Sequence, residues 1–273
     1  MSAHISLTKD TRSISFDGMK IIYDSYGVGY HTLVFIHGWS CNRELWSEQE
    51  PIYNKYRSIL VDLPGHGASE APLNVDYNNE MFARAINEIL QHERITQAVL
   101  IGHSMGGPIA TMVLRLFPHT VSGIFYVDSF WKYPQAYLTL KEREELKAKL
   151  WDDEKFFSII SALFRDNDDM DNSVRNTVTK VMMTTPKHVR VSVVATDAVP
   201  HALGYDDVFN IPAVHVVSER YSNIDKMWLH HLPQLHLAVW REAGHFLQIE
   251  NPEALNKLVN KFLVDNNLLQ NLS

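Results

Sequence analysis

Short apolar runs alternate with longer mixed stretches over the first 128 residues. Four of these runs are rich in β-branched or aromatic side chains and are closely followed by Gly or Asp, at 32–36, 58–61, 97–101 and 123–127. Near-continuous apolar strands of this kind are typical of a parallel sheet that helices cover on both faces. The pattern therefore predicts buried strands joined by helices.

Helical patterns lie between these runs. Apolar residues from Met81 to Leu90 recur at spacings that place them on one face of a helix. A second apolar helix is expected at 109–117, after the third run. Strands and helices in alternation predict a doubly wound α/β sheet.

The alternation of strand and helix patterns stops between about residue 129 and residue 210. This stretch contains a single glycine, Gly204, and its pattern is helical. Thr139 and Glu142 have the spacing of a capping box, which predicts a charged helix through Leu150. The acidic segment 165–171 is expected to be a solvated turn.

Strand patterns resume after this stretch, at 211–217 and 235–240. Pro252 then marks the first turn of a final helix. We therefore expect a core made of residues 1–128 and 211–273, which a helical insertion at 129–210 interrupts.

Composition narrows the class of protein. The 273 residues are 45% hydrophobic and 21% charged, an ordinary globular balance for one α/β domain with an insertion. The net charge of −7 argues against nucleic acid or an anionic membrane as partner. Cys41, the single cysteine, excludes an intrachain disulfide and is expected to be a small buried hydrophobe.

The chain shows no sign of a membrane or export segment. No stretch approaches 18 apolar residues, so no membrane span is expected. The polar start, Met1 to Thr11, does not have the apolar region of a signal peptide. The expected location is cytoplasmic, and the pattern says nothing of the oligomeric state.

The segment Gly102-His-Ser-Met-Gly106 carries the first candidate chemistry. It matches G-x-S-x-G between a predicted strand and a predicted helix, which is the context in which this motif presents a nucleophilic serine on a sharp turn. Ser104 would then be exposed above the sheet, near the positive end of the helix dipole. The plain alternative is a serine in an ordinary glycine-rich turn.

Four motifs in order make the chain resemble the α/β-hydrolase fold superfamily. They are His37-Gly-Trp-Ser40, Asp62-Leu-Pro-Gly-His-Gly-Ala-Ser69, Gly102-His-Ser-Met-Gly-Gly107 and Ala243-Gly-His-Phe246. The resemblance covers nearly the whole chain and implies a mostly parallel doubly wound sheet with an inserted helical cap. It does not name the substrate, because this fold supports many activities.

Serine needs a base to accept its proton as it attacks, and His245 is the predicted base. It follows a glycine on the loop after the last strand, where this fold carries its base. His103 should point away from Ser104, and His37 and His66 are expected to be structural. The pair at 230–231 has no third ligand at metal spacing, so it predicts no zinc site. The sequence also has no H-E-x-x-H, no cysteine cluster and no G-x-G-x-x-G, so we predict no metal or organic cofactor.

The acid of the predicted triad departs from the common pattern of this fold. Tyr221 occupies the position after the strand at 211–217 where such proteins usually carry an aspartate, and a tyrosine is not ionised at neutral pH. Some members of the superfamily place the acid before the cap, where this chain has Asp128. Asp128 is therefore the predicted acid, Asp225 and Glu219 are the alternatives, and a helix N-cap is the structural interpretation of Asp128.

The attacked carbonyl becomes an oxyanion, which requires preorganised N–H donors. The predicted donors are the backbone N–H groups of Met105 and Trp39. The aromatic residues of the insertion, including Trp151, Phe156 and Phe157, are expected to form its inner side. The residues predicted to contact a small-to-medium hydrophobic substrate are Trp39, Phe130, Trp131 and Phe246.

The predicted reaction is hydrolysis of an ester, thioester or lactone through an acyl-serine intermediate. Hydrolysis of a C–C bond in a diketone uses the same parts and stays open. A second alternative is a cofactor-free ring-cleaving dioxygenase of the quinolone type, which shares the fold, the early acid and a glycine-tryptophan pair such as Gly38-Trp39. A third is a binding protein that kept the fold without catalysis.

Overall fold

The computed structural model describes residues 8–28, 31–130, 139–164, 172–195, 207–222, 226–241 and 243–268, with only the backbone of 221, 226 and 227. An eight-stranded sheet has the order β1-β2-β4-β3-β5-β6-β7-β8. Its strands are β1 (Lys9–Phe16), β2 (Met19–Tyr26), β3 (His31–Ile36), β4 (Ser58–Val61), β5 (Gln97–His103), β6 (Val121–Val127), β7 (Ala213–Ser218) and β8 (Leu235–Trp240).

From β4 to β8 in this order, each strand pairs with the next in parallel. β1 and β2 form an antiparallel edge, and β2 pairs antiparallel with β4. All six predicted strands are present, and those at 58–61 and 235–240 have the predicted bounds. The sequence pattern missed β1 and β2. Five of the eight residues of β1 are exposed in a row, so no apolar run marks it. The predicted mostly parallel α/β sheet is confirmed.

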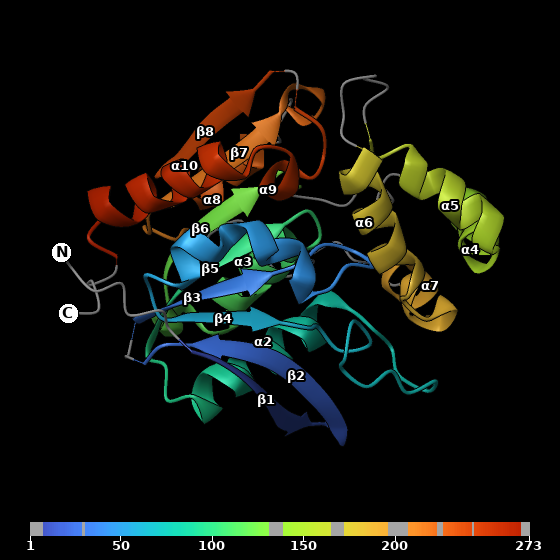
Figure 1. Cartoon of the computed structure of the whole chain (residues 1–273), viewed down its shortest axis with the longest axis horizontal. Coiled ribbons are helices and arrows are strands. Elements are labelled where there is room, and N and C mark those ends of the chain that lie inside the picture. The colour runs from blue at the N-terminus through green and yellow to red at the C-terminus, as the bar shows by residue number, and fades with distance from the viewer. Residues whose placement is uncertain are drawn as a thin grey trace.

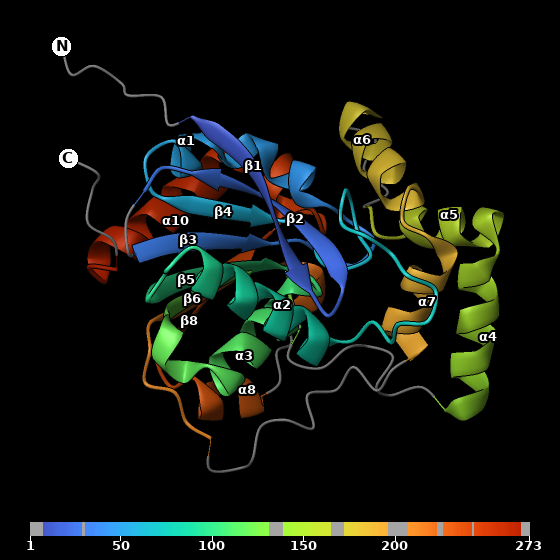
Figure 2. The same cartoon turned by 90° about the horizontal axis from the view of Figure 1, so that it is seen from below.

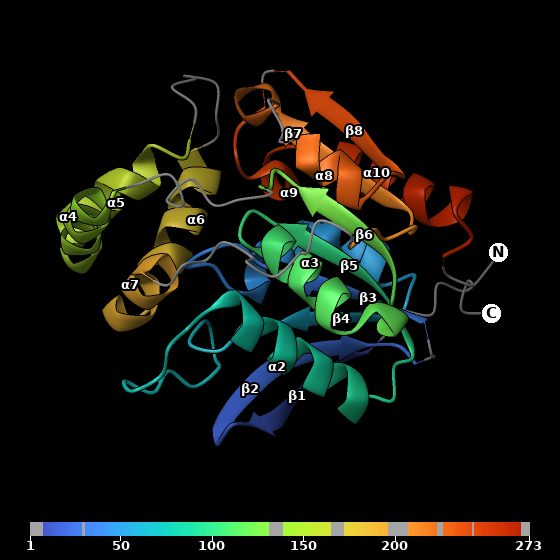
Figure 3. The ribbon, with the colours of Figure 1, turned by 180° about the vertical axis from the view of Figure 1, so that it is seen from behind.

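Helices cover both faces of the sheet. In Figure 2, α2 (Asn79–His92), α3 (Gly106–Leu116) and α8 (Lys226–His231) lie on one face, and α1 (Glu50–Tyr53) and α10 (Pro252–Asp265) lie on the other. Figure 3 shows α2, α3 and α8 in front of the strands. The short α9 (Leu247–Glu250) and the 3-10 helices at Arg43–Gln49, Pro118–Thr120 and Glu219–Tyr221 complete this part of the chain.

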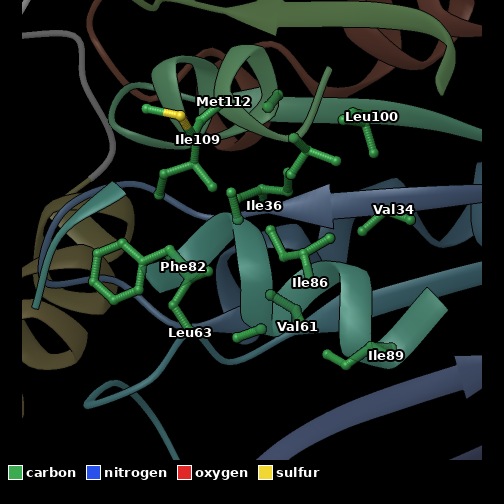
Figure 4. Close-up of a cluster of buried hydrophobic side chains, with 14 of the residues drawn as sticks. Val34, Ile36, Val61, Leu63, Phe82, Ile86, Ile89, Leu100, Ile109 and Met112 are labelled. Carbon is green, nitrogen blue, oxygen red and sulfur yellow. The ribbon is translucent and has the colours of Figure 1, made fainter. Parts of the chain in front are cut away.

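The amphipathic face predicted for 81–90 is the buried face of α2. Phe82, Ile86 and Ile89 are at most 1% exposed. Figure 4 shows them turned toward the sheet, where Val34 of β3 and Val61 of β4 belong to the same apolar cluster. Burial of each such side chain stabilises the fold by about 1.5–3 kcal/mol. This packing holds the sheet rigid beneath the strand ends.

The helical insertion expected at 129–210 contains α4 (Leu140–Trp151), α5 (Asp153–Ser161), α6 (Asn172–Met183) and α7 (Lys187–Ala195). These four helices lie beyond the carboxyl ends of the parallel strands (Figure 1). The predicted capping box is present, because Thr139 and Glu142 exchange hydrogen bonds at the start of α4. The acidic segment 165–171 lies outside the described residues.

The predicted aromatic inner side of the insertion is wrong for two of its members. Phe156 is fully buried, but Trp151 and Phe157 are 55% and 51% exposed. Phe156 shares its face of α5 with Ile160 four residues later, whereas Phe157 is turned about 100° away. Aliphatic side chains form most of the inner side instead.

In the part of the chain that the structure describes, none of the helices combines the length and the apolar character that crossing a membrane would require.

Candidate active site

The predicted site residues gather at the carboxyl edge of the parallel strands. Ser104 directly follows β5 and Asp128 directly follows β6, while Trp39 and His245 lie on the loops after β3 and β8. Ligands and reactive groups collect at this edge in open α/β sheets because the loops of neighbouring strands meet there.

Ser104 sits in a strained turn. Its φ of 51° lies in the left-handed region, which costs about 1–3 kcal/mol for a residue other than glycine. Close packing leaves no room for side chains on either side, since a Cβ on Gly102 would overlap the Gly106 carbonyl and one on Gly106 would overlap the Ile36 carbonyl. The Ser104 N–H donates to the Val127 carbonyl at 3.0 Å, which ties the turn to β6.

A continuous chain of hydrogen bonds joins three of the predicted residues. Ser104 Oγ lies 3.0 Å from His245 Nε2, and His245 Nδ1 lies 2.6 Å from Asp128 Oδ2. All three side chains are buried, and Ser104 is the most exposed at 8%. The structure therefore brings together a serine, a histidine that can act as base, and a carboxylate that can orient the histidine.

The environment of Asp128 favours its ionised form. Burial alone would raise the pKa of this carboxyl, but hydrogen bonding and attraction from His245, together with the Ser218 N–H, hold the pKa below its ordinary value. The Ser218 N–H donates to Asp128 Oδ1 at 2.6 Å. Because an ionised carboxylate only accepts, His245 Nδ1 carries the proton and Nε2 is left to accept from Ser104.

Among the described residues, the side-chain contacts of Asp128 are not those of a helix N-cap. Its carboxylate accepts from His245 and Ser218, and its φ of 41° places the backbone in the left-handed region. The alternative acid Glu219 is exposed in the 3-10 helix after β7. Asp225 lies outside the described residues.

Four other histidines are buried near this edge without joining the chain of hydrogen bonds. Burial lowers the pKa of His103 and of His66 to about 3. It lowers the pKa of His37 and of His215 to about 4. His103 Nε2 lies 2.9 Å from the His245 carbonyl, and the centroids of the two rings are 4.9 Å apart. These neutral rings position backbone groups.

The Asp62 motif forms a second buried polar centre. The Asp62 carboxylate accepts from the Arg43 guanidinium and from the backbone N–H groups of Arg43 and Ala68. These contacts fix the loop after β4, and they do not extend to Ser104. Among the described residues, no cluster of three or more His, Cys, Asp or Glu side chains has the arrangement of a metal site.

The predicted oxyanion donors lie on the two loops beside Ser104. Met105 is the residue before α3, whose N-terminus begins at Gly106. Trp39 lies in a turn that the Cys41 N–H closes onto the Gly38 carbonyl at 3.2 Å. A side chain on Gly38 would press on His103 and on the Ser104 Cβ, so the turn and the elbow approach each other closely.

A cavity of about 260 Å³ opens above Ser104 and His245. Trp39, Phe130 and Phe246 line it as predicted, and the Phe130 ring stacks over the His245 ring with 6.1 Å between centroids. Trp131 lies outside the described residues. Cys41 is 2% exposed, and burial raises the pKa of its thiol. The helical insertion lines the rest with aliphatic side chains and one methionine: Leu146, Leu150, Ile159, Leu163, Met182, Val193 and Val194.

The sequence pattern missed a carboxylate that clamps the His245 loop. Glu250 accepts from the Gly244 N–H at 2.7 Å with one oxygen and from the Phe246 N–H at 3.0 Å with the other. These two N–H groups flank His245 on either side. The available signal was an acidic residue five positions after the histidine, at the end of the short helix α9.

A serine behind the elbow was also missed. Ser129 Oγ donates to the Ser104 carbonyl at 2.7 Å, and the Ser129 N–H donates to His215 Nε2 at 3.2 Å. Its position directly after Asp128 was the only signal in the sequence. Glu250 and Ser129 both hold backbone, so no motif of reactive residues reveals them.

Comparison with known proteins places this arrangement in a family. A family model described as alpha/beta hydrolase fold matches residues 31–173, which is more than half of the chain. The chain therefore belongs to the alpha/beta hydrolase fold family. The matched range includes the elbow, Asp128 and the loop after β3.

Curated relatives match the chain over shorter ranges. An uncharacterized hydrolase of Bacillus subtilis, YugF, is 37% identical over 120 residues, 43% of this chain and 44% of the relative. A pimeloyl-[acyl-carrier protein] methyl ester esterase of Wigglesworthia glossinidia brevipalpis is 38% identical over 104 residues, 38% of each protein. The chain thus spans less than half the length of the curated relatives it matches.

Solved structures share the fold over nearly the whole chain. Est816, described as an N-acyl homoserine lactone degrading enzyme, has a TM-score of 0.79 and 24% identity, and the match covers 92% of this chain and 100% of Est816. A thermophilic esterase from Thermogutta terrifontis has a TM-score of 0.77 at 20% identity, over 94% and 99% of the two chains. At these identities the likeness concerns the fold.

Proposed function

We propose that this protein is a serine hydrolase that cleaves an ester, thioester or lactone of a small-to-medium hydrophobic acyl group. The observation that carries the proposal is the hydrogen-bonded chain from Ser104 through His245 to Asp128, which opens directly into an apolar cavity. Esterases among the relatives and structural neighbours support the same reaction class.

The proposed first step is acylation of Ser104. His245 Nε2 accepts the hydroxyl proton as Ser104 Oγ attacks the substrate carbonyl, and Asp128 stabilises the imidazolium that forms. The backbone N–H groups of Met105 and Trp39 hold the oxyanion of the tetrahedral intermediate. The intermediate collapses to the acyl-serine, and His245 gives its proton to the departing alcohol or thiol.

The second step returns the enzyme to its starting state. Water replaces the alcohol above the acyl-serine, and His245 Nε2 accepts a proton from it during attack on the acyl carbonyl. Collapse of the second tetrahedral intermediate releases the carboxylic acid, and the proton on His245 returns to Ser104 Oγ. No net charge or electron is left on the protein.

The cavity favours a neutral aliphatic acyl group. Its described lining contains no Asp, Glu, Lys or Arg side chain. Its volume of about 260 Å³ is just below the roughly 300–1,000 Å³ range of pockets for drug-sized ligands. We assign the helical insertion, 129–210, as the cap over the site, with the core at 1–128 and 211–273.

Labelling with a fluorophosphonate probe tests the nucleophile. The expected result is one adduct, which peptide mass mapping assigns to Ser104 and which Ser104→Ala abolishes. Ser47→Ala removes an exposed serine far along the chain from the elbow and is the matched control. Labelling elsewhere, or equal labelling of Ser104→Ala, contradicts the proposal.

Turnover measurements separate this reaction from the alternatives. A series of p-nitrophenyl esters, from acetate to decanoate, should be hydrolysed without added metal or cofactor. Oxygen uptake with a 3-hydroxy-4-quinolone, in the absence of ester turnover and of a Ser104 adduct, would assign the dioxygenase reaction instead. Cleavage of a diketone at rates far above those of esters would assign C–C bond hydrolysis.

A further inference from the structure

Two hydrogen bonds join the helical insertion directly to the turn at 38–41. Thr185 Oγ1, from the segment between α6 and α7, donates to the Ser40 carbonyl at 3.0 Å. Trp39 Nε1 donates to the carbonyl of Arg190 in α7 at 3.1 Å. The partners lie 145 and 151 residues apart along the chain, so the insertion holds a turn that belongs to the sheet edge.

On the insertion side, contacts of its side chain hold Arg190 in place. The Arg190 side chain is 1% exposed, and its Nε donates to the Leu150 carbonyl at 2.6 Å. Its guanidinium also binds Asp153 at 2.7 Å and stacks 4.0 Å from the centre of the Phe156 ring. Arg190 thereby links α4, α5 and α7 into one unit next to the turn.

The turn end of these bonds is strained. Ser40 has a φ of 55°, a conformation that costs about 1–3 kcal/mol for a residue other than glycine. Such a conformation persists where the surrounding structure holds it. Thr185 is 4% exposed and Ser40 is fully buried, so their hydrogen bond is shielded from water. Loss of the Thr185 hydroxyl would leave a buried carbonyl without this donor.

The strained residue directly follows Trp39, whose backbone N–H is the proposed oxyanion donor on this loop. The orientation of that N–H depends on the backbone of the turn, which hydrogen bonds from the Thr185 hydroxyl and the Cys41 N–H constrain. A shift of about 1 Å in a catalytic group can lower a rate by about a hundredfold.

We propose that Thr185 is a positioning residue for the oxyanion hole. Its hydrogen bond to Ser40 holds the turn at 38–41 so that the Trp39 N–H faces the developing oxyanion. The inference rests on the proposed acyl-serine function. The helical insertion then serves the chemical step through Thr185, in addition to lining the cavity with apolar side chains.

Three variants of neighbouring threonines test this assignment. Thr185→Val keeps the shape of the side chain and removes its hydroxyl, whereas Thr185→Ser keeps the hydroxyl. Thr184→Val is the matched control, because Thr184 is exposed and, among the described residues, its hydroxyl donates to the Val181 carbonyl at the end of α6. Kinetics on a short p-nitrophenyl ester and thermal melting are measured for all three.

The expected result is a loss confined to the chemical step. In Thr185→Val, kcat should fall by about ten- to a hundredfold with KM within about twofold of wild type, since an oxyanion contact acts in the transition state. Thr185→Ser and Thr184→Val should match wild type. Affinity for a trifluoromethyl ketone, which forms an oxyanion on Ser104, should fall with kcat/KM in Thr185→Val.

Other outcomes overturn the assignment. If Thr185→Val behaves as Thr184→Val does, or if its loss appears in KM alone, Thr185 does not position the oxyanion donor. The same conclusion follows if ketone affinity stays at the wild-type value while kcat falls. Absence of ester turnover and of a Ser104 adduct in wild type is a separate result, which refutes the proposed function and this inference with it.

Discussion

The two walls of the cavity are built by different means. On the sheet side, backbone hydrogen bonds hold the reactive residues, from Ser104 N–H to Val127, from Asp128 N–H to Val216 and from Ser218 N–H to the Asp128 carboxylate. On the insertion side, most of the wall consists of aliphatic side chains such as Leu146 and Leu163.

The difference indicates that the two walls have different tasks. The sheet side places the proposed reactive groups, and the insertion side selects the acyl groups that fit the cavity. Groups held by backbone bonds and by close glycine contacts have little freedom to move, which suits atoms that must meet at fixed distances. An aliphatic wall tolerates exchange of one hydrophobic side chain for another. Substitutions on the sheet side should therefore change kcat, and most substitutions on the insertion side should change KM and chain-length preference.

The strongest test of the sheet side removes the nucleophile or the base. Ser104→Ala and His245→Ala should each lower kcat for short esters by about 10⁶, and the double variant should be no slower, because the two residues act as one unit. Circular dichroism verifies that each variant is folded. Turnover near the wild-type value in folded Ser104→Ala would contradict the assignment of the chemical step to the sheet side.

The next largest effect is expected from the acid. Asp128 accepts hydrogen bonds at both carboxylate oxygens, whereas Asn has one acceptor and one donor group. Asp128→Asn would therefore turn its amide N–H₂ either toward the Ser218 N–H or toward His245, where it favours the wrong tautomer. The expected loss in kcat is about 10⁴.

Matched variants distinguish Asp128 from the other predicted acids. Glu219→Gln alters an exposed carboxylate after β7, and Asp225→Asn alters the remaining alternative. Each should retain turnover close to wild type. A loss in either variant as large as that in Asp128→Asn would move the acid to the other strand end.

Acid should lower the free energy of unfolding through the buried histidines of the sheet side. Burial holds the pKa at about 3 or 4 for four histidines of this side, against about 6.5 when unfolded, namely His37, His66, His103 and His215. Below about pH 6.5 the unfolded chain binds protons that the folded chain does not. Stability is therefore retained above that pH and falls as the pH drops toward about 4, by up to about 1.4 kcal/mol per pH unit for each histidine.

Urea unfolding at about pH 7.5, 6 and 5 measures this slope. His66→Asn should make the pH dependence shallower, whatever its effect on absolute stability. His236→Asn changes an exposed histidine and should leave the slope as it is. A pH-independent free energy of unfolding over this range would contradict the buried neutral state of these rings.

A smaller effect is expected where a side chain holds backbone beside the base. In Glu250→Gln, one of the two N–H groups that flank His245 would face an amide N–H₂ in place of an oxygen. The loop should loosen and kcat should fall by about tenfold, because misplacement of the base weakens the proton transfer. Glu253→Gln, at an exposed position in α10, should have no such effect.

The smallest effect belongs to the insertion side. Leu163→Ala enlarges the cavity, so relative kcat/KM should shift toward longer esters by about fourfold, which corresponds to burial of one additional methylene. The ratio of octanoate to acetate hydrolysis measures the shift. Leu73→Ala, at a residue 78% exposed, is the control. An equal change for both esters would contradict the claim that the insertion side sets the chain-length preference.

Local patterns in the sequence determined most of the elements and marked the proposed reactive residues. The capping box at Thr139, the amphipathic face of α2 and the strand at 58–61 each depend on neighbours a few residues apart, and each is present. The glycines around Ser104 likewise mark a turn whose close packing leaves no room for a Cβ at those positions. The order of these local signals was sufficient to predict the fold.

Tertiary structure alone decided how distant segments meet. The separation of 117 residues between Asp128 and His245, and of 145 between Ser40 and Thr185, leaves no periodic trace in the sequence. The outward turn of Trp151 also depends on how α4 docks, since an aromatic side chain fits either a core or an exposed face. Contacts of this kind follow from packing the whole chain, because neither partner's neighbours specify which residue it will touch.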